Sequence, residues 1–169
     1  MSAAHNVESP KQSAYLALGS NIRPERFIRL AVEELGKRFE ISGISSVWET
    51  TAEGFVGADF LNAVVQIETN LTPIALKYRV LRPLEAQLGR VRTEHKYSPR
   101  TIDIDILIFG HAVLDPEIWS QPHLAVPLAE LLPDLLHNNF GENLKTTADN
   151  LKMSSAIQLK TGILPENIS

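Results

Sequence analysis

The sequence predicts an α+β sandwich with an antiparallel or mixed sheet and helices on one face. Two observations carry this prediction. Short apolar runs bounded by turn residues alternate with two helical stripes, and the resulting order is β-α-β-β-α-β. The length of 169 residues, of which 44% are hydrophobic and 21% charged, suits a single globular domain.

The first strand and the first helix follow a loose N-terminal tail. We expect residues 1–12 to form this tail and residues 14–18 to form a short apolar strand. Pro24 suits the first turn of the helix that follows, and Gly36 can end it. The apolar residues of this helix repeat at helical spacing: Phe27, Ala31 and Leu35.

Two strands and a capped helix come next. Residues 41–48 and 60–69 have strand-like apolar patterns, and the loop between them, 50–59, holds two glycines. Thr72 can cap the second helix, and Gly89 lies beyond its end. The expected buried stripe of this helix is Ile74, Tyr78, Leu81, Leu84 and Leu88.

The remaining elements have weaker signals. Pro83 lies inside the second predicted helix, where it removes a backbone hydrogen bond and should cause a kink. After a last strand, we expect a short helix or two turns over 127–136. Weak periodicity over 138–169 predicts a partly ordered C-terminal tail, which leaves 13–137 as the folded domain.

The most informative stretch is Pro99–Gly110, a predicted strand that carries two carboxylates. Alternation along a strand places Asp103 and Asp105 on one face, roughly 7 Å apart, and continues that face with Leu107 and Phe109. Because an unpaired buried charge is costly, the acids predict a partner, and Mg²⁺ is the simplest one. A solvated surface pair is the alternative. The opposite face is expected to collect Ile102, Ile104, Ile106 and Ile108.

Basic residues precede the acid pair within eleven positions: Arg90, Arg92, His95, Lys96 and Arg100. Arginine binds phosphate through a planar fork and lysine acts as a point charge, so this basic cluster suits a polyphosphate. Beside carboxylates it suits a Mg²⁺–nucleotide complex, because the metal bridges acid and phosphate oxygens. A solvated basic loop is the alternative.

Two weaker features accompany the acids. Phe60 and Asn62 share one strand face and could hold a flat heteroaromatic ring by stacking and hydrogen bonding, although ordinary packing is the alternative. His123 follows a proline and either donates to a phosphate or anchors a loop.

Composition excludes several classes of function. The net charge of −4 and the pI near 5.7 argue against a general nucleic-acid or anionic-membrane binder. The absence of cysteine excludes disulfides and thiolate metal sites and is compatible with a cytoplasmic protein. No apolar run approaches the roughly 18 residues of a membrane span. We expect a monomer.

Taken together, these segments resemble 6-hydroxymethyl-7,8-dihydropterin pyrophosphokinase, an enzyme family of the folate pathway. The likeness covers roughly residues 13–136, and Pro-Arg-Thr-x-Asp-x-Asp at 99–105 is its most specific part. The other matching pieces are Leu-Gly-Ser-Asn at 18–21, Phe-Leu-Asn-Ala at 60–63, Gly-Arg-Val-Arg at 89–92, Pro-His at 122–123 and Pro-Leu at 127–128.

The resemblance implies a ferredoxin-like core and transfer of pyrophosphate from ATP to the pterin's hydroxymethyl oxygen, with AMP as the second product. By that likeness Asp103 and Asp105 hold two Mg²⁺ ions around the triphosphate, and Arg92 and Arg100 join them as catalytic residues. The expected ATP contacts are Glu85, Arg90, Arg92, Arg100, Ile106 and His123. The expected pterin contacts are Thr50, Phe60, Asn62 and Tyr97.

The chain departs from the family pattern after His123. Family members usually have a longer loop there with an arginine and an aromatic residue, whereas only 124–126 separate His123 from Pro127. Glu53 also replaces an expected apolar residue in the pterin loop. Two alternatives therefore stay open: a diverged pterin- or nucleotide-binding homologue with weak or no transfer, and an α+β interaction module. The chain beyond Leu136 could supply the missing groups.

Overall fold

The computed structural model describes residues 9–51, 57–96 and 98–165; residues 1–8, most of the predicted N-terminal tail, lie outside these ranges. The strands are β1 (Gln12–Ser20), β2 (Glu40–Ile44), β3 (Val47–Thr50), β4 (Phe60–Thr69), β5 (Asp103–Phe109), β6 (Ala112–Val113) and β7 (Gln158–Lys160). The helices are α1 (Pro24–Arg38), α2 (Pro73–Ala75), the π-helix η1 (Leu76–Leu81), α3 (Arg82–Gln87), the 3-10 helix η2 (Pro116–Trp119), α4 (Pro122–Leu131) and α5 (Leu144–Met153).

The strands of the described chain form one seven-stranded sheet in which the neighbours are β6-β5-β1-β4-β3-β7, with β2 also paired to β4. All of these pairings are antiparallel. The predicted β-α-β-β-α-β order is confirmed between β1 and β5. None of the helices in the described ranges is long and apolar enough to cross a membrane.

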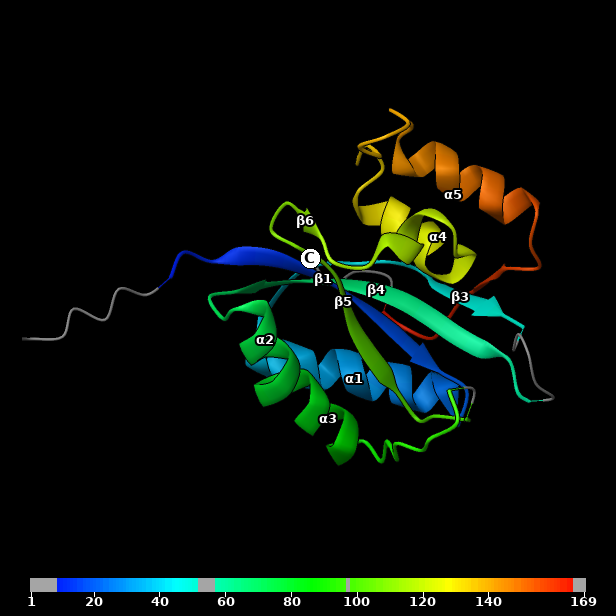
Figure 1. Ribbon diagram of the computed structural model, residues 1–169. Coiled ribbons are helices and arrows are strands. Elements are labelled where there is room, and N and C mark those ends of the chain that lie inside the picture. Colours follow the sequence, from blue (N-terminus) through cyan, green and yellow to red (C-terminus); the bar gives the residue numbers. More distant parts are fainter. Residues whose placement is uncertain (1–8, 52–56, 97, 166–169) are drawn as a thin grey trace, which may run out of the picture.

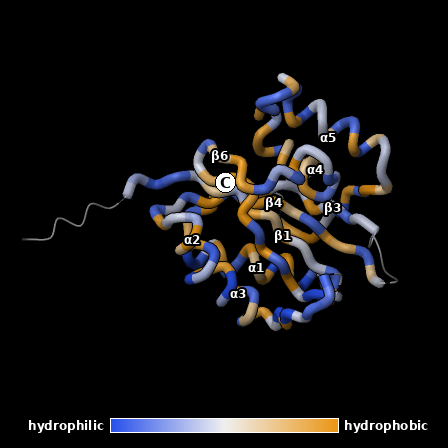
Figure 2. Tube along the Cα trace, in the orientation of Figure 1, coloured by the Kyte–Doolittle hydropathy of each residue, from blue (hydrophilic) through white to orange (hydrophobic). Residues whose placement is uncertain are grey.

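Helices cover both faces of the sheet, which corrects the expectation that they lie on one face (Figure 1). On one side, Leu16 and Ile67 of the sheet pack with Leu35 of α1 and with the segment from η1 to α3. On the other side, a second core joins Val64 to Leu128 of α4 and to α5. Figure 2 shows hydrophobic positions along the central strands, between these two helical layers.

Strand β5 has a bulge at Leu107. Tyr15 of β1 pairs with Ile108, and the next residue, Leu16, pairs with Ile106, so Leu107 is an extra residue in the ladder. Side chains alternate along a strand, and one inserted residue therefore reverses the faces of everything beyond it.

The bulge makes the predicted faces of β5 only partly right. Asp103 and Asp105 precede it and border the same pocket, as predicted. Beyond it, Ile108 packs in the core with α4 and Phe109 packs in the core with α1, which exchanges the two predicted positions.

The second predicted helix contains a π-helical turn. Thr72 caps it as predicted, because its Oγ1 accepts the backbone N–H of Ala75 at 3.2 Å. At the end of η1 the N–H of Arg82 donates five residues back, to the carbonyl of Lys77. Since Pro83 lacks an N–H and would clash with the carbonyl four residues back in a regular α-helix, the wider turn accommodates it.

The π-helical turn also shifts the buried stripe. Ile74 and Tyr78, predicted to be buried, are 72% and 62% exposed, whereas Leu76 is fully buried. A π-turn takes more residues than an α-turn, so the apolar spacing does not carry across it. The rest of the stripe is buried as predicted: Leu81, Leu84 and Leu88.

The strand predicted over 41–48 is divided into β2 and β3 at Ser45. The backbone N–H of Ser45 donates to the carbonyl of Val64 at 2.9 Å, and the Oγ of Ser45 accepts the N–H of Val64 at 2.8 Å. The backbone N–H of Ser46 donates to Glu130 at 2.9 Å instead of continuing the ladder. A side-chain oxygen thus replaces one backbone partner and interrupts the strand.

The chain after β5 is more ordered than its sequence pattern indicates. The helix predicted from Pro127 starts at Pro122, which takes the first-turn position and leaves Pro127 inside α4. Residues 138–169, expected to be a partly ordered tail, contain α5 and β7, and β7 pairs with β3. Ile157 and Ile163 of this segment are buried.

Candidate active site

A cavity of about 470 Å³ opens where β1, β4 and β5 face α4 and the chain before β7. The predicted site residues that border it are Thr50, Phe60, Asn62, Arg100, Asp103, Asp105 and His123. Residues from four separate stretches of sequence therefore meet around one space. Tyr97 and Glu53 lie outside the described residues.

Asn62 is held rigidly at one end of the pocket. It is buried on β4, and its Nδ2 donates to the carbonyl of Trp48 at 3.2 Å and to Oγ1 of Thr50 at 3.0 Å. The register of β3 on β4 pairs Trp48 with Asn62 and Thr50 with Phe60, so the sheet itself sets these positions. The guanidinium of Arg100 lies 5.8 Å from the centre of the Phe60 ring, within range of a cation–π contact.

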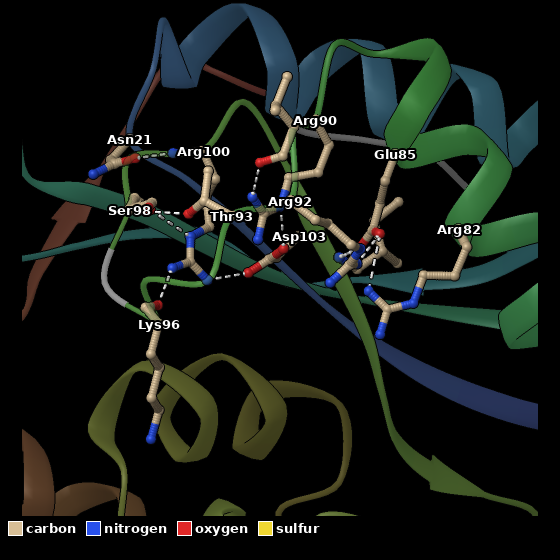
Figure 3. A network of polar contacts seen from close by, with 12 residues as sticks. Asn21, Arg82, Glu85, Arg90, Arg92, Thr93, Lys96, Ser98, Arg100 and Asp103 are labelled. Atoms are coloured by element: carbon tan, nitrogen blue, oxygen red, sulfur yellow. Dashed lines mark hydrogen bonds and ion pairs between the residues drawn. The ribbon is translucent and has the colours of Figure 1, made fainter.

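Asp103 already has positive partners in the structure. Nε of Arg90 lies 2.9 Å from its Oδ1, and Nη1 of Arg100 donates to its Oδ2. Figure 3 shows both guanidinium groups around this carboxylate, with Nη2 of Arg100 donating to the backbone carbonyl of Lys96 at 2.5 Å. The backbone N–H of Arg100 donates to Oδ1 of Asn21 at 2.8 Å, which ties the basic cluster to the end of β1.

Asp105 has a different environment although it stands two residues further on β5. No ion pair or hydrogen bond of its side chain occurs among the described residues, and the residue is exposed within the pocket. Withdrawal from bulk water and the charge of Asp103 together raise the pKa of Asp105. The carboxylate is thus available to a cationic group in the cavity.

Glu85 forms a buried acidic centre beside the pocket. Its side chain is 1% exposed; Oε1 accepts the N–H of Ile104 at 2.8 Å, and Oε2 lies 2.5 Å from Nη2 of Arg92 and 3.4 Å from Nη1 of Arg82. Burial raises the pKa of Glu85 to about 7, against the lowering effect of the hydrogen bond from Ile104.

The predicted ATP contacts therefore fall into two groups. Arg100 and His123 border the pocket, whereas Glu85, Arg90, Arg92 and Ile106 do not. Arg90 and Arg92 pair with acids, and Ile106 packs against the core on the α1 side.

Several pocket residues carried no recognised signal in the sequence: Glu117, Gln121, Ser155, Ala156 and Ile157. Glu117 and Gln121 lie just before the Pro-His pair, and that proximity could have drawn attention to them. The other three enter the pocket because β7 pairs with β3. That pairing joins distant parts of the chain, so no local pattern could have identified them.

Two carboxylates, an aromatic–amide pair and two members of the basic cluster, Lys96 and Arg100, border one pocket, and this arrangement is typical of an enzyme of the phosphoryl-transfer class. The family model of 7,8-dihydro-6-hydroxymethylpterin-pyrophosphokinase (HPPK) matches residues 15–133. The chain belongs to this family and is an enzyme of that kind, as the resemblance at 99–105 predicted.

Two bacterial relatives named 2-amino-4-hydroxy-6-hydroxymethyldihydropteridine pyrophosphokinase are similar over most of their length. The protein of Methylorubrum extorquens is 41% identical over 135 residues, covering 73% of this chain and 84% of its own. The protein of Aquifex aeolicus is 34% identical over 143 residues, covering 79% of this chain and 88% of its own.

Solved structures confirm the α+β fold. A wild-type HPPK-DHPS of Plasmodium falciparum superimposes with a TM-score of 0.68 at 13% identity, covering 86% of this chain and 45% of that one. The same protein with pteroate gives a TM-score of 0.65 at 14% identity, covering 89% and 43%. This chain spans less than half of those longer proteins, and at such identities the likeness concerns the fold alone.

Proposed function

We propose that this pocket transfers pyrophosphate from ATP to the hydroxymethyl oxygen of 6-hydroxymethyl-7,8-dihydropterin, giving the pterin diphosphate and AMP in folate biosynthesis. The observation that carries the proposal is the arrangement of a single cavity, with Asp103, Asp105 and Arg100 on one part of its wall and Phe60 and Asn62 on another. Membership of the HPPK family supports it.

The pterin end consists of Phe60, Asn62 and Thr50. The Nδ2 group of Asn62 donates its two hydrogen bonds to Trp48 and Thr50, which leaves the Oδ1 of Asn62 as an acceptor for an N–H of the heterocycle. Phe60 offers a face for stacking. Because Asn62 is locked before a ligand arrives, little side-chain entropy is lost on binding. Tyr97 remains a proposed fourth pterin contact.

The carboxylates of Asp103 and Asp105 fit Mg²⁺, which prefers one or two carboxylates together with phosphate oxygens. Asp105, with no ion pair in the described chain and a raised pKa, is the group whose charge most needs a cation. Two Mg²⁺ ions bound with ATP at these carboxylates would neutralise phosphate charge and help align the reacting oxygens.

The basic residues would hold the triphosphate in line with the pterin alcohol. Arg100 borders the pocket and, paired with Asp103, has its guanidinium fixed before phosphate binds. Arg92 is half exposed and can exchange Glu85 for a phosphate oxygen. Orienting the alcohol beside the β-phosphorus of ATP accounts for the catalysis without a covalent protein intermediate. Glu85, Arg90, Ile106 and His123 stay proposed ATP contacts.

We also propose that a single chain is the active form, as the sequence analysis expects. The cysteine-free composition fits our proposal of a cytoplasmic location. A size-exclusion measurement with light scattering tests the first point, because a stable dimer would contradict it.

The experiment that tests the function incubates the protein with ATP, MgCl₂ and 6-hydroxymethyl-7,8-dihydropterin and follows AMP and pterin diphosphate by chromatography. Both products in equal amounts, and neither in the presence of a chelator, support the proposal. Calorimetric binding of both ligands without product would identify a diverged homologue, an alternative that the comparisons do not favour. No binding of either ligand would indicate an interaction module.

A further inference from the structure

The chain between α5 and β7 forms one wall of the pocket. Ser155, Ala156 and Ile157 border the cavity. β7 pairs with β3 so that Leu159 lies opposite Trp48 and Gln158 opposite Glu49. One further step in this antiparallel register brings Ile157 beside Thr50. The wall therefore stands at the end of the pocket that holds Thr50, Phe60 and Asn62, away from the strand that carries the acids.

Ser155 has an unusual hydroxyl. Its Oγ is buried and has no hydrogen-bond partner among the described residues. Buried hydroxyls are normally hydrogen-bonded, and an unmade bond weakens the folded state. Rotation about the Cα–Cβ bond has three staggered positions, so the hydroxyl can turn from the protein toward the cavity. A polar ligand atom in the cavity would supply the missing partner.

We propose that Ser155 is a substrate-binding residue whose hydroxyl hydrogen-bonds the pterin. The proposal rests on the proposed function for the identity of the ligand, and on the pocket geometry for the residue. The neighbours of the wall, Thr50 and Asn62, are neutral hydrogen-bonding groups, and a hydroxyl beside them suits the nitrogens and exocyclic groups of a heterocycle. The triphosphate instead requires the charged groups of β5 and the basic cluster.

The test compares Ser155→Ala with Gln158→Ala, a matched variant of an exposed residue on the same segment that does not border the cavity. Calorimetry measures binding of 6-hydroxymethyl-7,8-dihydropterin in the presence of MgCl₂ and a non-hydrolysable ATP analogue. We expect Ser155→Ala to weaken pterin binding about 3- to 10-fold, the effect of one neutral hydrogen bond, and Gln158→Ala to leave it unchanged. Binding of the ATP analogue should be the same in both variants.

Thermal unfolding separates a binding role from a structural one. Ser155→Ala removes a hydroxyl that has no partner, so its unfolding midpoint should equal or exceed that of the wild type. Unchanged pterin binding, or equal weakening of pterin and nucleotide binding, would overturn the proposal, as would a lowered midpoint with wild-type affinity. If the wild type itself binds neither ligand, the proposed function fails. If the wild type binds both ligands and Ser155→Ala binds the pterin equally well, the proposed function stands and the role of Ser155 does not.

Discussion

Nη2 of Arg92 lies 2.5 Å from Oε2 of Glu85, a carboxylate that is 1% exposed, while Arg92 itself is 50% exposed. The pair joins the basic cluster to α3 and leaves the outer part of the guanidinium accessible. The three arginines predicted from sequence to bind phosphate thus have a second role in the ligand-free protein, because Arg92 pairs with Glu85 while Arg90 and Arg100 pair with Asp103.

Replacing Glu85 by glutamine should remove a pH-dependent contribution to stability. Burial raises the pKa of Glu85 from its ordinary 4.5 to about 7. Between these values the unfolded chain has released a proton that the folded chain keeps, so the wild-type free energy of unfolding falls as pH rises through this window, by up to about 3 kcal/mol. Denaturant titrations of the wild type and Glu85→Gln at several pH values in this window check the prediction. The free energy of unfolding of the variant should not fall with pH, and an equal fall in both proteins would contradict it.

Asp105→Asn should slow transfer strongly without harming the fold. The change removes the carboxylate that has no ion pair among the described residues, and we expect a loss of about 100- to 1000-fold in kcat. Because the folded protein raises the pKa of Asp105, a neutral side chain should leave the unfolding midpoint unchanged or higher. Asp149→Asn, which affects an exposed ion pair on α5, is the control. A near-normal rate would end the metal-binding role.

Asp103→Asn should lower both stability and activity. It leaves Arg90 and Arg100, whose side chains are 9% and 17% exposed, without their shared counter-charge. We expect a loss of about 2 kcal/mol in the free energy of unfolding. The measurement is a denaturant titration beside Asp105→Asn, and equal stability of the two variants would show that the arginine pairs contribute little.

The backbone of α4 should be protected from hydrogen exchange before any ligand binds. Residues 124–128 are buried, and the N–H of Ala125 donates to the carbonyl of Gln121 at 2.9 Å. We expect protection over 120–127 to change little on adding ATP analogue, MgCl₂ and pterin, because the short connection after His123 is already helical. Strong ligand-induced protection there would reveal a closing movement.

Ile163→Ala should show that the C-terminal segment stabilises the domain. Ile163 is 5% exposed and packs in the core on the α1 side, so truncating it should cost about 3 kcal/mol of unfolding free energy. Leu159→Ala, at a position 51% exposed on β7, should cost less than about 1 kcal/mol. Equal costs for the two variants would contradict this assignment.

The elements that sequence predicted correctly are those set by local signals. The strand predicted over 60–69 matches β4, because its alternation follows from side chains within the strand. Thr72 caps its helix as expected. The bulge at Leu107 and the edge strand β7 depend on pairing with distant strands. The three residues of β7 are all exposed and form no apolar pattern.

The same distinction applies to the site. Arg100, Asp103 and Asp105 lie in one contiguous motif and could be singled out from the printed sequence. The pairing of Asp103 with Arg90 could not, because it joins residues 13 positions apart through tertiary packing. Ser155 shows the limit most clearly, since a serine in a short connection has no pattern that distinguishes it.

The central position of β1 determines how the chain can assemble during synthesis. β1 lies between β4 and β5, so this strand lacks its first neighbour until residue 69 has been synthesised, and its second until residue 109. Such long-range pairing slows folding and leaves the apolar edges of β1 unpaired until its partner strands have been made. Until β5 has been made, we therefore expect the edges of β1 to be accessible to chaperones and to aggregation.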